Sequence, residues 1–338
     1  MTKQFRKAVY IGRFQPPHIE HIATIQDGLE IADQVIVVIG SAHVPRSPRN
    51  PWTAKERQEM IQLCFSEDEN ARLSFVYLED SLYNDSFWAA NLQNLLGLGD
   101  EKVALLGYKK DASSFYLDMF PQWQFVPRMT GQKGLDATDI RKKVFLDLEL
   151  PSATEVADPI CTRLAQYMLN HDFFDFMTKE FSYIRKYKES WACAPYPPTF
   201  VTADAIVIKS SHVLVVKRGQ HPGKNLFALP GGFVNPDELL VDCCIRELKE
   251  ETKIAVSTEE LYRSIQDQKV FDHPRRSLRG RTITHAFLIN LGIGKLPTVK
   301  AGDDAAEALW MPLSDVNRYR ELFFEDHVSV VHGLTSRL

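Results

Sequence analysis

The sequence has little that would place the protein outside the cell, in a membrane or on nucleic acid. No apolar run is long enough to span a bilayer, and the amino terminus lacks the apolar stretch of a signal peptide. The five cysteines are scattered, with no Cys-x-x-Cys pair, which indicates a reducing compartment. A formal net charge of -4 offers no broad basic surface for nucleic acid or an anionic membrane. We therefore expect a cytoplasmic protein with neither as a partner, and homo-oligomerisation is left open.

At 338 residues the chain is long for one compact core, so we expect two domains. The first half alternates nearly continuous apolar strands with helical segments, which is typical of a parallel sheet covered on both faces. After residue 200, strand-like runs surround one long helix, which indicates a mixed sheet. Three prolines within 195–198 favour an extended, stiff connector. The sequence thus predicts an α/β protein with a domain at 1–190 that ends in a helical segment, a proline-rich linker at 191–200 and a domain at 201–338.

Apolar periodicity also predicts where the individual elements lie. In the first domain, strands are expected at Ala8–Ile11, Val35–Ile39, Leu73–Leu78, Val103–Leu106 and Gln124–Val126, and helices at Ile19–Ala32, Ala54–Cys64, Phe87–Leu96 and within Pro159–Lys188. In the second, strands are expected at Val201–Lys209, Val213–Val216, Thr282–Asn290 and Leu309–Met311, with a helix at Leu239–Glu251.

The most informative stretch is an acidic helix that follows a pair of glycines. Glu247, Glu250 and Glu251 stand at i, i+3 and i+4, so a helix places their carboxylates on one face, where like charges repel. Bound Mg²⁺ or Mn²⁺ reverses that balance, because hard divalent cations take carboxylate oxygens and bridge substrate phosphates. Arg246 can pair with a ligand carboxylate, and Gly231 lets the backbone approach the metal. These residues predict a metal site for phosphate chemistry.

This stretch resembles the Nudix box, the signature of hydrolases that cut a nucleoside diphosphate linked to another group. The matching positions are Gly232, Glu238, Arg246, Glu247, Leu248, Glu250, Glu251 and Ile254. The resemblance implies an α/β/α sandwich with a mixed sheet, a metal held by Gly231, Glu247, Glu250 and Glu251, and catalytic roles for Glu250 and Glu251. Lys253 stands where the family usually has glycine, so we expect altered loop geometry there without loss of the metal. A solvated, charged helix is the alternative.

The first predicted strand ends in a second informative segment, Gly12-Arg13-Phe14-Gln15-Pro16-Pro17-His18-Ile19-Glu20-His21. Gly12 allows close backbone approach to a ligand, and His18 and His21 lie one turn apart at the start of a helix. A helix N-terminus favours an anion, and two imidazoles there can donate hydrogen bonds to phosphate oxygens. The segment is neither a Gly-x-Gly-x-x-Gly fingerprint nor a P-loop. It predicts a site for nucleotide phosphates, with two ordinary surface histidines as the alternative.

This segment resembles the Gly-x-Phe-x-Pro-x-His-x-x-His motif of the nucleotidyltransferase superfamily, and residues 135–141 resemble its Ile-Ser-x-Thr-x-x-Arg segment. Residues 50–57 and 83–88 are similar to those of archaeal-type nicotinamide-mononucleotide adenylyltransferases. The resemblance covers residues 7–143 and implies a Rossmann-like parallel sheet that transfers AMP from ATP to nicotinamide mononucleotide. The implied ATP and mononucleotide contacts are Gly12, Arg13, Phe14, His18, His21, Arg57, Trp88, Lys109, Asp111, Thr138 and Arg141, of which His18, His21 and Arg141 are expected to be catalytic.

Some of these positions have an equally plain structural interpretation. Trp88 could stack on the nicotinamide ring or anchor its helix in the core. Lys109 and Asp111 could contact phosphate or ribose, or lie in a solvated loop. The acceptor could also be another phosphorylated molecule, such as phosphopantetheine, and the residues do not separate nicotinamide from nicotinate mononucleotide.

The flanks of the acidic helix resemble the ADP-ribose pyrophosphatase branch of the Nudix family, in residues 216–219, 229–232 and 271–281. They imply ADP-ribose contacts from Arg218, Arg275, Arg279 and Glu307, with Glu307 or a neighbouring aspartate as general base. A solvated basic loop is the alternative for the arginines, and a plain turn is the alternative for Glu307 and its neighbouring aspartates. The whole chain thus resembles a bifunctional nicotinamide-mononucleotide adenylyltransferase/Nudix hydrolase. A second domain that only senses ADP-ribose is the alternative.

Overall fold

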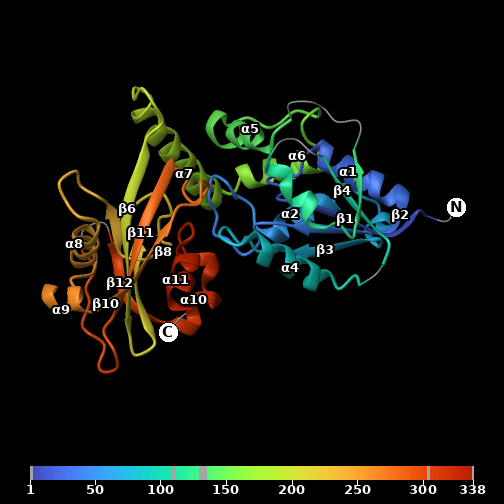
Figure 1. The fold of residues 1–338 in the computed structure, drawn as a ribbon. Helices are drawn as coiled ribbons and strands as arrows, with labels where there is room; N and C mark the ends of the chain where they lie inside the picture. The colour runs from blue at the N-terminus through green and yellow to red at the C-terminus, as the bar shows by residue number, and fades with distance from the viewer. Residues whose placement is uncertain (1–2, 100, 109–111, 129–134, 303–304, 337–338) are drawn as a thin grey trace. The chain divides into compact units, whose positions relative to one another are not determined.

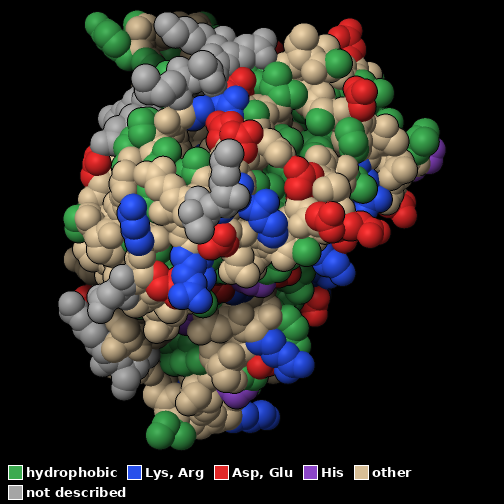
Figure 2. Space-filling view, turned by 90° about the vertical axis from the view of Figure 1, so that its right-hand side faces the viewer, with side chains coloured by type: hydrophobic (Ala, Val, Ile, Leu, Met, Phe, Trp, Pro, Cys, Tyr) green, Lys and Arg blue, Asp and Glu red, His purple; other side chains and the backbone are tan. Residues whose placement is uncertain are grey.

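Figure 1 shows the computed structural model, which describes residues 3–99, 101–108, 112–128, 135–302 and 305–336. The chain forms two compact units, the first ending at Phe181 and the second beginning at Ser182. Among the described residues, no helix is both long and apolar enough to cross a lipid bilayer. On the face shown in Figure 2, acidic and basic side chains of the described residues are intermingled rather than gathered by sign.

The first unit is built on a parallel sheet with the strand order β3-β2-β1-β4-β5. The strands are β1 (Phe5–Gly12), β2 (Ala32–Ile39), β3 (Leu73–Tyr77), β4 (Val103–Gly107) and β5 (Gln124–Pro127). This order reverses direction next to β1, and open α/β sheets bind ligands outside the carboxyl ends of the strands at such a point. The predicted Rossmann-like parallel sheet is therefore confirmed, and the segment that follows β1 lies at the ligand-binding end.

Helices cover both faces of this sheet (Figure 1). On one face, α1 (Ile19–Ile31) and α2 (Ala54–Gln62) bury apolar residues such as Ile25 and Ile61, and on the other α4 (Asp85–Leu96) buries Leu92. The further helical elements are α3 (Glu67–Asn70), η1 (Ala112–Met119), α5 (Ala137–Lys142), η2 (Lys143–Asp147), α6 (Asp158–Met168) and α7 (His171–Ser190).

The second unit is built on a mixed sheet with the order β10-β11-β6-β7-β12, while β8 pairs with β7 and β9 with β6. The strands are β6 (Thr199–Lys209), β7 (His212–Arg218), β8 (Phe227–Ala228), β9 (Gly231–Phe233), β10 (Ile265–Phe271), β11 (Arg281–Asn290) and β12 (Ala305–Pro312). β6 and β11 are parallel, and β10 and β12 run antiparallel to their neighbours. The predicted mixed sheet and the α/β class are confirmed.

Alternating side chains of β6 separate the two faces of this mixed sheet. Ala205 and Val207 pack beneath α8 (Leu240–Thr252), whereas Ile206 and Ile208 pack beneath α11 (His327–Thr335) on the opposite face. The remaining helices are α9 (Thr258–Arg263), α10 (Leu313–Arg318) and η3 (Arg320–Leu322). Sequence reasoning assigned no element to the segments that form β10 and α11.

The segment between α7 and β6 differs in conformation from the extended connector that its prolines favoured. Residues 191–196 form turns and bends. The N–H of Ala192 donates to the carbonyl oxygen of Glu189, and the N–H of Ala194 donates to that of Trp191. The Trp191 ring meets Phe200 of β6 edge-on, with 5.2 Å between centroids. Local hydrogen bonds and this aromatic contact therefore fold the chain into turns ahead of the prolines, whereas residues 197–198 are in neither a turn nor a bend.

Candidate active sites

The loop after β1 folds back over the carboxyl end of the parallel sheet. A Cβ atom on Gly12 would lie 2.7 Å from the ring of Phe14, so only glycine fits beneath that ring. Phe14 has a positive φ of 53°, and its buried ring meets the His21 ring edge-on at 4.9 Å. The Gly-x-Phe part of the motif therefore shapes the loop that packs against the histidine.

His18 and His21 lie together at the N-terminus of α1. The backbone N–H of His18 donates to Nδ1 of His21 over 3.2 Å, and the two rings stack with 3.5 Å between centroids. Burial, and secondarily the neighbouring His18, holds the pKa of His21 well below its usual value. His21 is therefore neutral near pH 7, and because its Nδ1 accepts, its proton is on Nε2. An Nε2–H at this helix end can donate to a phosphate oxygen.

Arg57 holds the loops that follow β1 and β2. Its guanidinium donates to the carbonyl oxygens of Arg13 at 2.5 Å, Gly40 at 2.8 Å and Ser41 at 3.1 Å. The side chain is almost fully buried, and burial lowers its pKa to about 10. These contacts make Arg57 a support for the site, and its predicted contact with a nucleotide stays a prediction.

Arg141 also supports the loop that follows β1, through hydrogen bonds to backbone carbonyl oxygens. It donates to the carbonyl oxygens of Gln15 at 2.5 Å and Pro48 at 3.0 Å, and to the hydroxyl of Thr138 at 3.1 Å. Burial is the main cause that lowers its pKa to about 10, and the charge of the exposed Arg13 lowers it further. Positive charge thus gathers beside the N-terminus of α1, as an anion site requires.

The other predicted contacts of the first unit have different surroundings. Trp88 is half-buried in α4 and packs against Tyr116 and Phe120, which is the arrangement of a core anchor. Lys109 and Asp111 lie outside the described residues. The structure therefore brings together Gly12, Arg13, Phe14, His18, His21, Arg57, Thr138 and Arg141 around the loop after β1.

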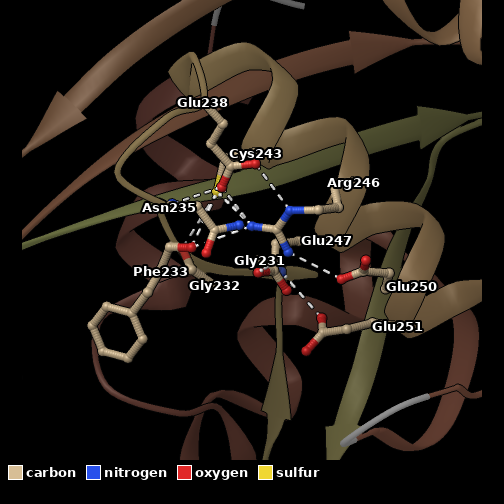
Figure 3. A network of polar contacts seen from close by, with 10 residues as sticks. All are labelled: Gly231, Gly232, Phe233, Asn235, Glu238, Cys243, Arg246, Glu247, Glu250 and Glu251. Carbon is tan, nitrogen blue, oxygen red and sulfur yellow. Dashed lines mark hydrogen bonds and ion pairs between the residues drawn. The ribbon is translucent and has the colours of Figure 1, made fainter.

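In the second unit, Arg246 binds three carboxylates at once (Figure 3). Its guanidinium donates to both oxygens of Glu238, at 2.6 and 3.0 Å, to Glu247 at 2.7 Å and to Glu250 at 3.0 Å. The bond from Arg246 is the largest influence on Glu238 and lowers its pKa to about 2. The predicted pairing of Arg246 with ligand carboxylates is thus present, and it holds the loop before α8 against the helix.

Two glycines of β9 allow α8 to lie close to the sheet. A Cβ on Gly232 would lie 2.5 Å from the carboxyl carbon of Glu247, and a Cβ on Gly231 would overlap the backbone of β6 at Ala203. The N–H of Gly231 donates to Glu251 at 3.1 Å. The Gly-Gly pair is therefore needed for close packing of β9 against Glu247 and β6, and it positions two of the three acidic side chains. The predicted approach of the glycine backbone to a metal stays a prediction.

The acidic side chains of α8 suit a hard divalent cation. Burial raises the pKa of Glu247, and it raises that of Glu251 to about 8, so nearby protein groups do not fully balance these two charges. Within the described part of the chain, no three His, Cys, Asp or Glu side chains already converge as a formed metal site. Arg246 lies between Glu247 and Glu250 instead. Two carboxylates with uncompensated burial, together with the more exposed Glu250 on the same helix, are a donor set that fits Mg²⁺ or Mn²⁺.

Lys253 ends α8 in the conformation that glycine favours. Its φ and ψ are 43° and 34°, in the left-handed region, and its N–H donates to the carbonyl oxygen of Lys249 at 3.0 Å. The chain therefore accepts a lysine at this position with a backbone that a glycine would also adopt. The altered loop geometry that we expected from this residue is not seen at its backbone dihedrals.

The predicted ADP-ribose contacts fall into two groups. Arg218 and Arg279 both lie over the ring of Phe324, at 4.1 and 5.9 Å from its centroid. Arg275 is exposed in the loop between β10 and β11, and Glu307 is exposed on β12. The structure thus brings Arg218 and Arg279 together, while Arg275 and Glu307 project into solvent.

Comparisons with known proteins also divide the chain into two parts, one family matching the first half and another matching the second. Residues 198–332 match the NUDIX domain family, and residues 9–143 match the Cytidylyltransferase-like family. A nicotinamide/nicotinic acid mononucleotide adenylyltransferase from Acinetobacter baylyi is 39% identical over 145 residues, which cover 42% of this chain and 77% of the relative. An ADP-ribose pyrophosphatase from Methanocaldococcus jannaschii is 37% identical over 131 residues, which cover 39% of this chain and 70% of the relative.

Among solved structures, a match can extend over both halves at once. One such match is a crystal structure of a bifunctional NMN adenylyltransferase/ADP ribose pyrophosphatase from Francisella tularensis, complexed with AMP and a Mn ion. It is 33% identical to this chain with a TM-score of 0.91, and the match covers 98% of this chain and 99% of that one. The chain belongs to this bifunctional family. The resemblance that we predicted for the two domains is therefore confirmed.

Sequence reasoning missed several buried polar residues on the α11 face of the Nudix domain. Asp204 accepts a hydrogen bond from the hydroxyl of Thr284 at 2.6 Å and lies against Gly231. An acidic residue inside the apolar strand β6 was an available signal for it. Arg276 and Asp326 form a buried bidentate ion pair, at 2.9 and 3.0 Å, between positions 50 residues apart. No pattern in the sequence links those two positions.

Proposed function

We propose that the first domain transfers AMP from ATP to nicotinamide mononucleotide, forming NAD and pyrophosphate, and that the second hydrolyses ADP-ribose to AMP and ribose 5-phosphate. The observation that carries the proposal is that each unit assembles its own motif residues: the stacked His18 and His21 in one, and the carboxylates around Arg246 in the other. The similarity of the whole chain to the bifunctional Francisella protein supports both reactions in one chain.

In the first reaction, an oxygen of the mononucleotide phosphate attacks the α-phosphorus of ATP, the bond to the bridging oxygen breaks, and pyrophosphate leaves. The attacking phosphate is already ionised, so alignment and charge stabilisation supply most of the acceleration. We assign His18 and His21 to the ATP phosphates, because they occupy the N-terminus of α1. Arg13 and Arg141 add positive charge beside them, and Arg57 holds the loops. The same groups would serve nicotinate mononucleotide.

In the second reaction, Glu247, Glu250, Glu251 and the backbone of Gly231 would hold Mg²⁺ or Mn²⁺. A divalent cation bound there would polarise the diphosphate and lower the pKa of an attacking water. The Mn ion of the Francisella protein supports a divalent metal in this family. Arg246 keeps two of the carboxylates aligned on the helix. Arg218, Arg275 and Arg279 would bind the substrate, and Glu307 stays our candidate for the general base.

The test measures both reactions on the same protein. The purified chain is incubated with Mg²⁺ and either ATP plus nicotinamide mononucleotide or ADP-ribose, and NAD and AMP are quantified. We expect His18→Ala to lose most NAD synthesis and to keep ADP-ribose hydrolysis. Glu250→Gln and Glu251→Gln should each lose most ADP-ribose hydrolysis and keep NAD synthesis. Full NAD synthesis in His18→Ala, or full hydrolysis in both glutamine variants, would contradict the corresponding assignment. Nicotinate mononucleotide and phosphopantetheine as acceptors test the alternatives for the first domain.

A further inference from the structure

Four consecutive residues that lead into α11, Phe324 to His327, contact the loops around the Nudix site, and we name them the C-terminal clasp. Asp326 pairs with Arg276, which anchors the loop between β10 and β11. His327 Nδ1 accepts the N–H of Leu229 at 2.8 Å, two residues before Gly231. One short segment therefore joins the arginine-bearing loop to the glycine loop that borders the acidic helix.

The ring of Phe324 lies at the centre of this clasp. It is 5% exposed, and its backbone N–H donates to the carbonyl oxygen of Phe227 at 2.8 Å. Gly223 closes over the ring with a positive φ of 74°, at a position where a Cβ would overlap the ring. Arg218 donates to the carbonyl oxygen of Pro222 in the same loop at 2.9 Å. Backbone contacts thus fix the position of the Phe324 ring.

Two guanidinium groups share this one ring. The Arg218 guanidinium carbon lies 4.1 Å from the ring centroid, and that of Arg279 lies 5.9 Å from it and 5.1 Å from the centroid of the Phe233 ring. Cations are attracted to an aromatic face, which offsets part of the repulsion between the two arginines. Glu325, held at a positive φ of 46°, reaches Arg279 at 3.9 Å. The charge of Arg218 also acts on Glu251, so this arginine lies near the acidic helix.

Two positive charges held side by side next to a metal-binding helix match the two negative charges of a diphosphate. We propose that Phe324 is a positioning residue of the Nudix site, whose ring holds Arg218 and Arg279 together as one diphosphate-binding pair. Phe324 touches no substrate in this arrangement and acts only through the two arginines. The inference rests on the proposed function, in which the second domain takes ADP-ribose.

The experiment compares two neighbouring phenylalanines. Phe324→Leu removes the ring beneath the arginines, whereas Phe323→Leu removes a ring that is equally buried but packs against Phe227 in the apolar core. We expect both variants to lose thermal stability. Only Phe324→Leu should raise KM and Kd for ADP-ribose, about three- to tenfold, as expected for the loss of a partly desolvated cation–π contact. Its kcat should stay within about twofold of the wild type, because the acidic helix is untouched.

A second comparison tests whether Phe324 acts through Arg218. In an Arg218→Met background, Phe324→Leu should raise Kd less than it does in the wild type, because only the longer contact of the ring with Arg279 remains to be lost. Independent, additive effects of the two substitutions would overturn the proposal. If Phe324→Leu does not fold, Phe324→Met also removes the ring while its flexible side chain fills the space.

Kd is measured by titration calorimetry with the metal chelated, so binding is observed apart from hydrolysis. A wild type that binds ADP-ribose without cleaving it would contradict the proposed hydrolysis, and a weaker Kd in Phe324→Leu alone would still support the positioning role. Equal Kd and KM in the Phe324→Leu and Phe323→Leu variants would overturn that role while leaving the hydrolysis intact. A wild type that neither binds nor cleaves ADP-ribose would overturn both.

Discussion

Gly232 of β9 and Glu247 of α8 occupy adjoining space, so that a Cβ on the glycine would lie 2.5 Å from the carboxyl carbon of the glutamate. The carboxylate is the end of a flexible side chain and can move aside, whereas the backbone of β9 is paired with β6 and cannot. The absence of a side chain at Gly232 therefore determines where one proposed metal ligand, Glu247, lies, and it has little effect on the stability of the rest of the fold.

We predict that Gly232→Ala lowers ADP-ribose hydrolysis about tenfold or more, because Glu247 must leave its place beside Arg246. The free energy of unfolding should change by less than about 1 kcal/mol, since only a side-chain end has to move. Steady-state hydrolysis and urea denaturation measure the two effects, and NAD synthesis on the same sample is the control. Hydrolysis at the wild-type rate would show that Glu247 need not lie where the structure has it.

The neighbouring substitution Gly231→Ala should act on stability instead. Its Cβ would overlap the carbonyl oxygen of Ala203 and approach Asp204 Cα to 2.8 Å, and neither backbone atom can move without distorting β6. We expect the Nudix domain to lose about 1–3 kcal/mol of unfolding free energy, the usual range for overpacking. Urea denaturation of Gly231→Ala beside Gly232→Ala measures the difference. Equal midpoints for the two variants would contradict this account.

Lys253→Gly tests whether the lysine impairs the Nudix site. Because the backbone at Lys253 is already left-handed, we expect ADP-ribose hydrolysis to stay within about twofold of the wild type. Thermal stability should change by no more than about 1 kcal/mol, since relief of left-handed strain is opposed by the greater freedom of glycine in the unfolded chain. Hydrolysis that is absent in the wild type and appears in Lys253→Gly would instead support the ADP-ribose-sensing alternative.

The buried His327 should make the Nudix domain less stable in mild acid. Burial lowers its pKa in the folded state, so below about pH 6.5 the unfolded chain binds a proton that the folded protein does not. This contribution to stability is fully present above that pH and falls by up to about 1.4 kcal/mol per pH unit below it.

His327→Asn keeps an acceptor for the N–H of Leu229 and removes the titration. The difference in unfolding free energy between wild type and variant should therefore shrink as the pH falls from about 7.5 to about 5. Denaturant titrations at several pH values measure it. If plots of unfolding free energy against pH stay parallel for the wild type and His327→Asn over this range, His327 does not titrate as proposed.

Asp326→Asn should destabilise the Nudix domain strongly. It leaves Arg276 as a buried charge without its bidentate partner, and breaking a buried ion pair costs about 3–5 kcal/mol. Replacing both residues, as Arg276→Met with Asp326→Leu, should cost less, because no charge is left buried. Urea denaturation of the single and double variants compares the two. A double variant less stable than Asp326→Asn would contradict this explanation.

Most of the secondary structure could be predicted because its signals are local. Apolar runs located β1, β2, β6 and β11, and helical periodicity located α1 and α8. The turns at 191–196 were mispredicted, because three prolines suggested an extended chain while neighbouring hydrogen bonds and the Trp191–Phe200 contact decided otherwise. Strand β10, which is an edge of the confirmed mixed sheet, and helix α11, which packs against that sheet, went unpredicted.

By itself, the sequence determined which residues share a helix face or a turn. The spacing of Glu247, Glu250 and Glu251 follows from 3.6 residues per turn, and the position of His18 and His21 follows from their place after a strand. Only the tertiary structure decided that Arg57 and Arg141 support loops, and that Phe324 lies beneath Arg218 and Arg279. Those relationships join segments far apart in the chain, and they exist only because sheet topology and burial bring the segments together.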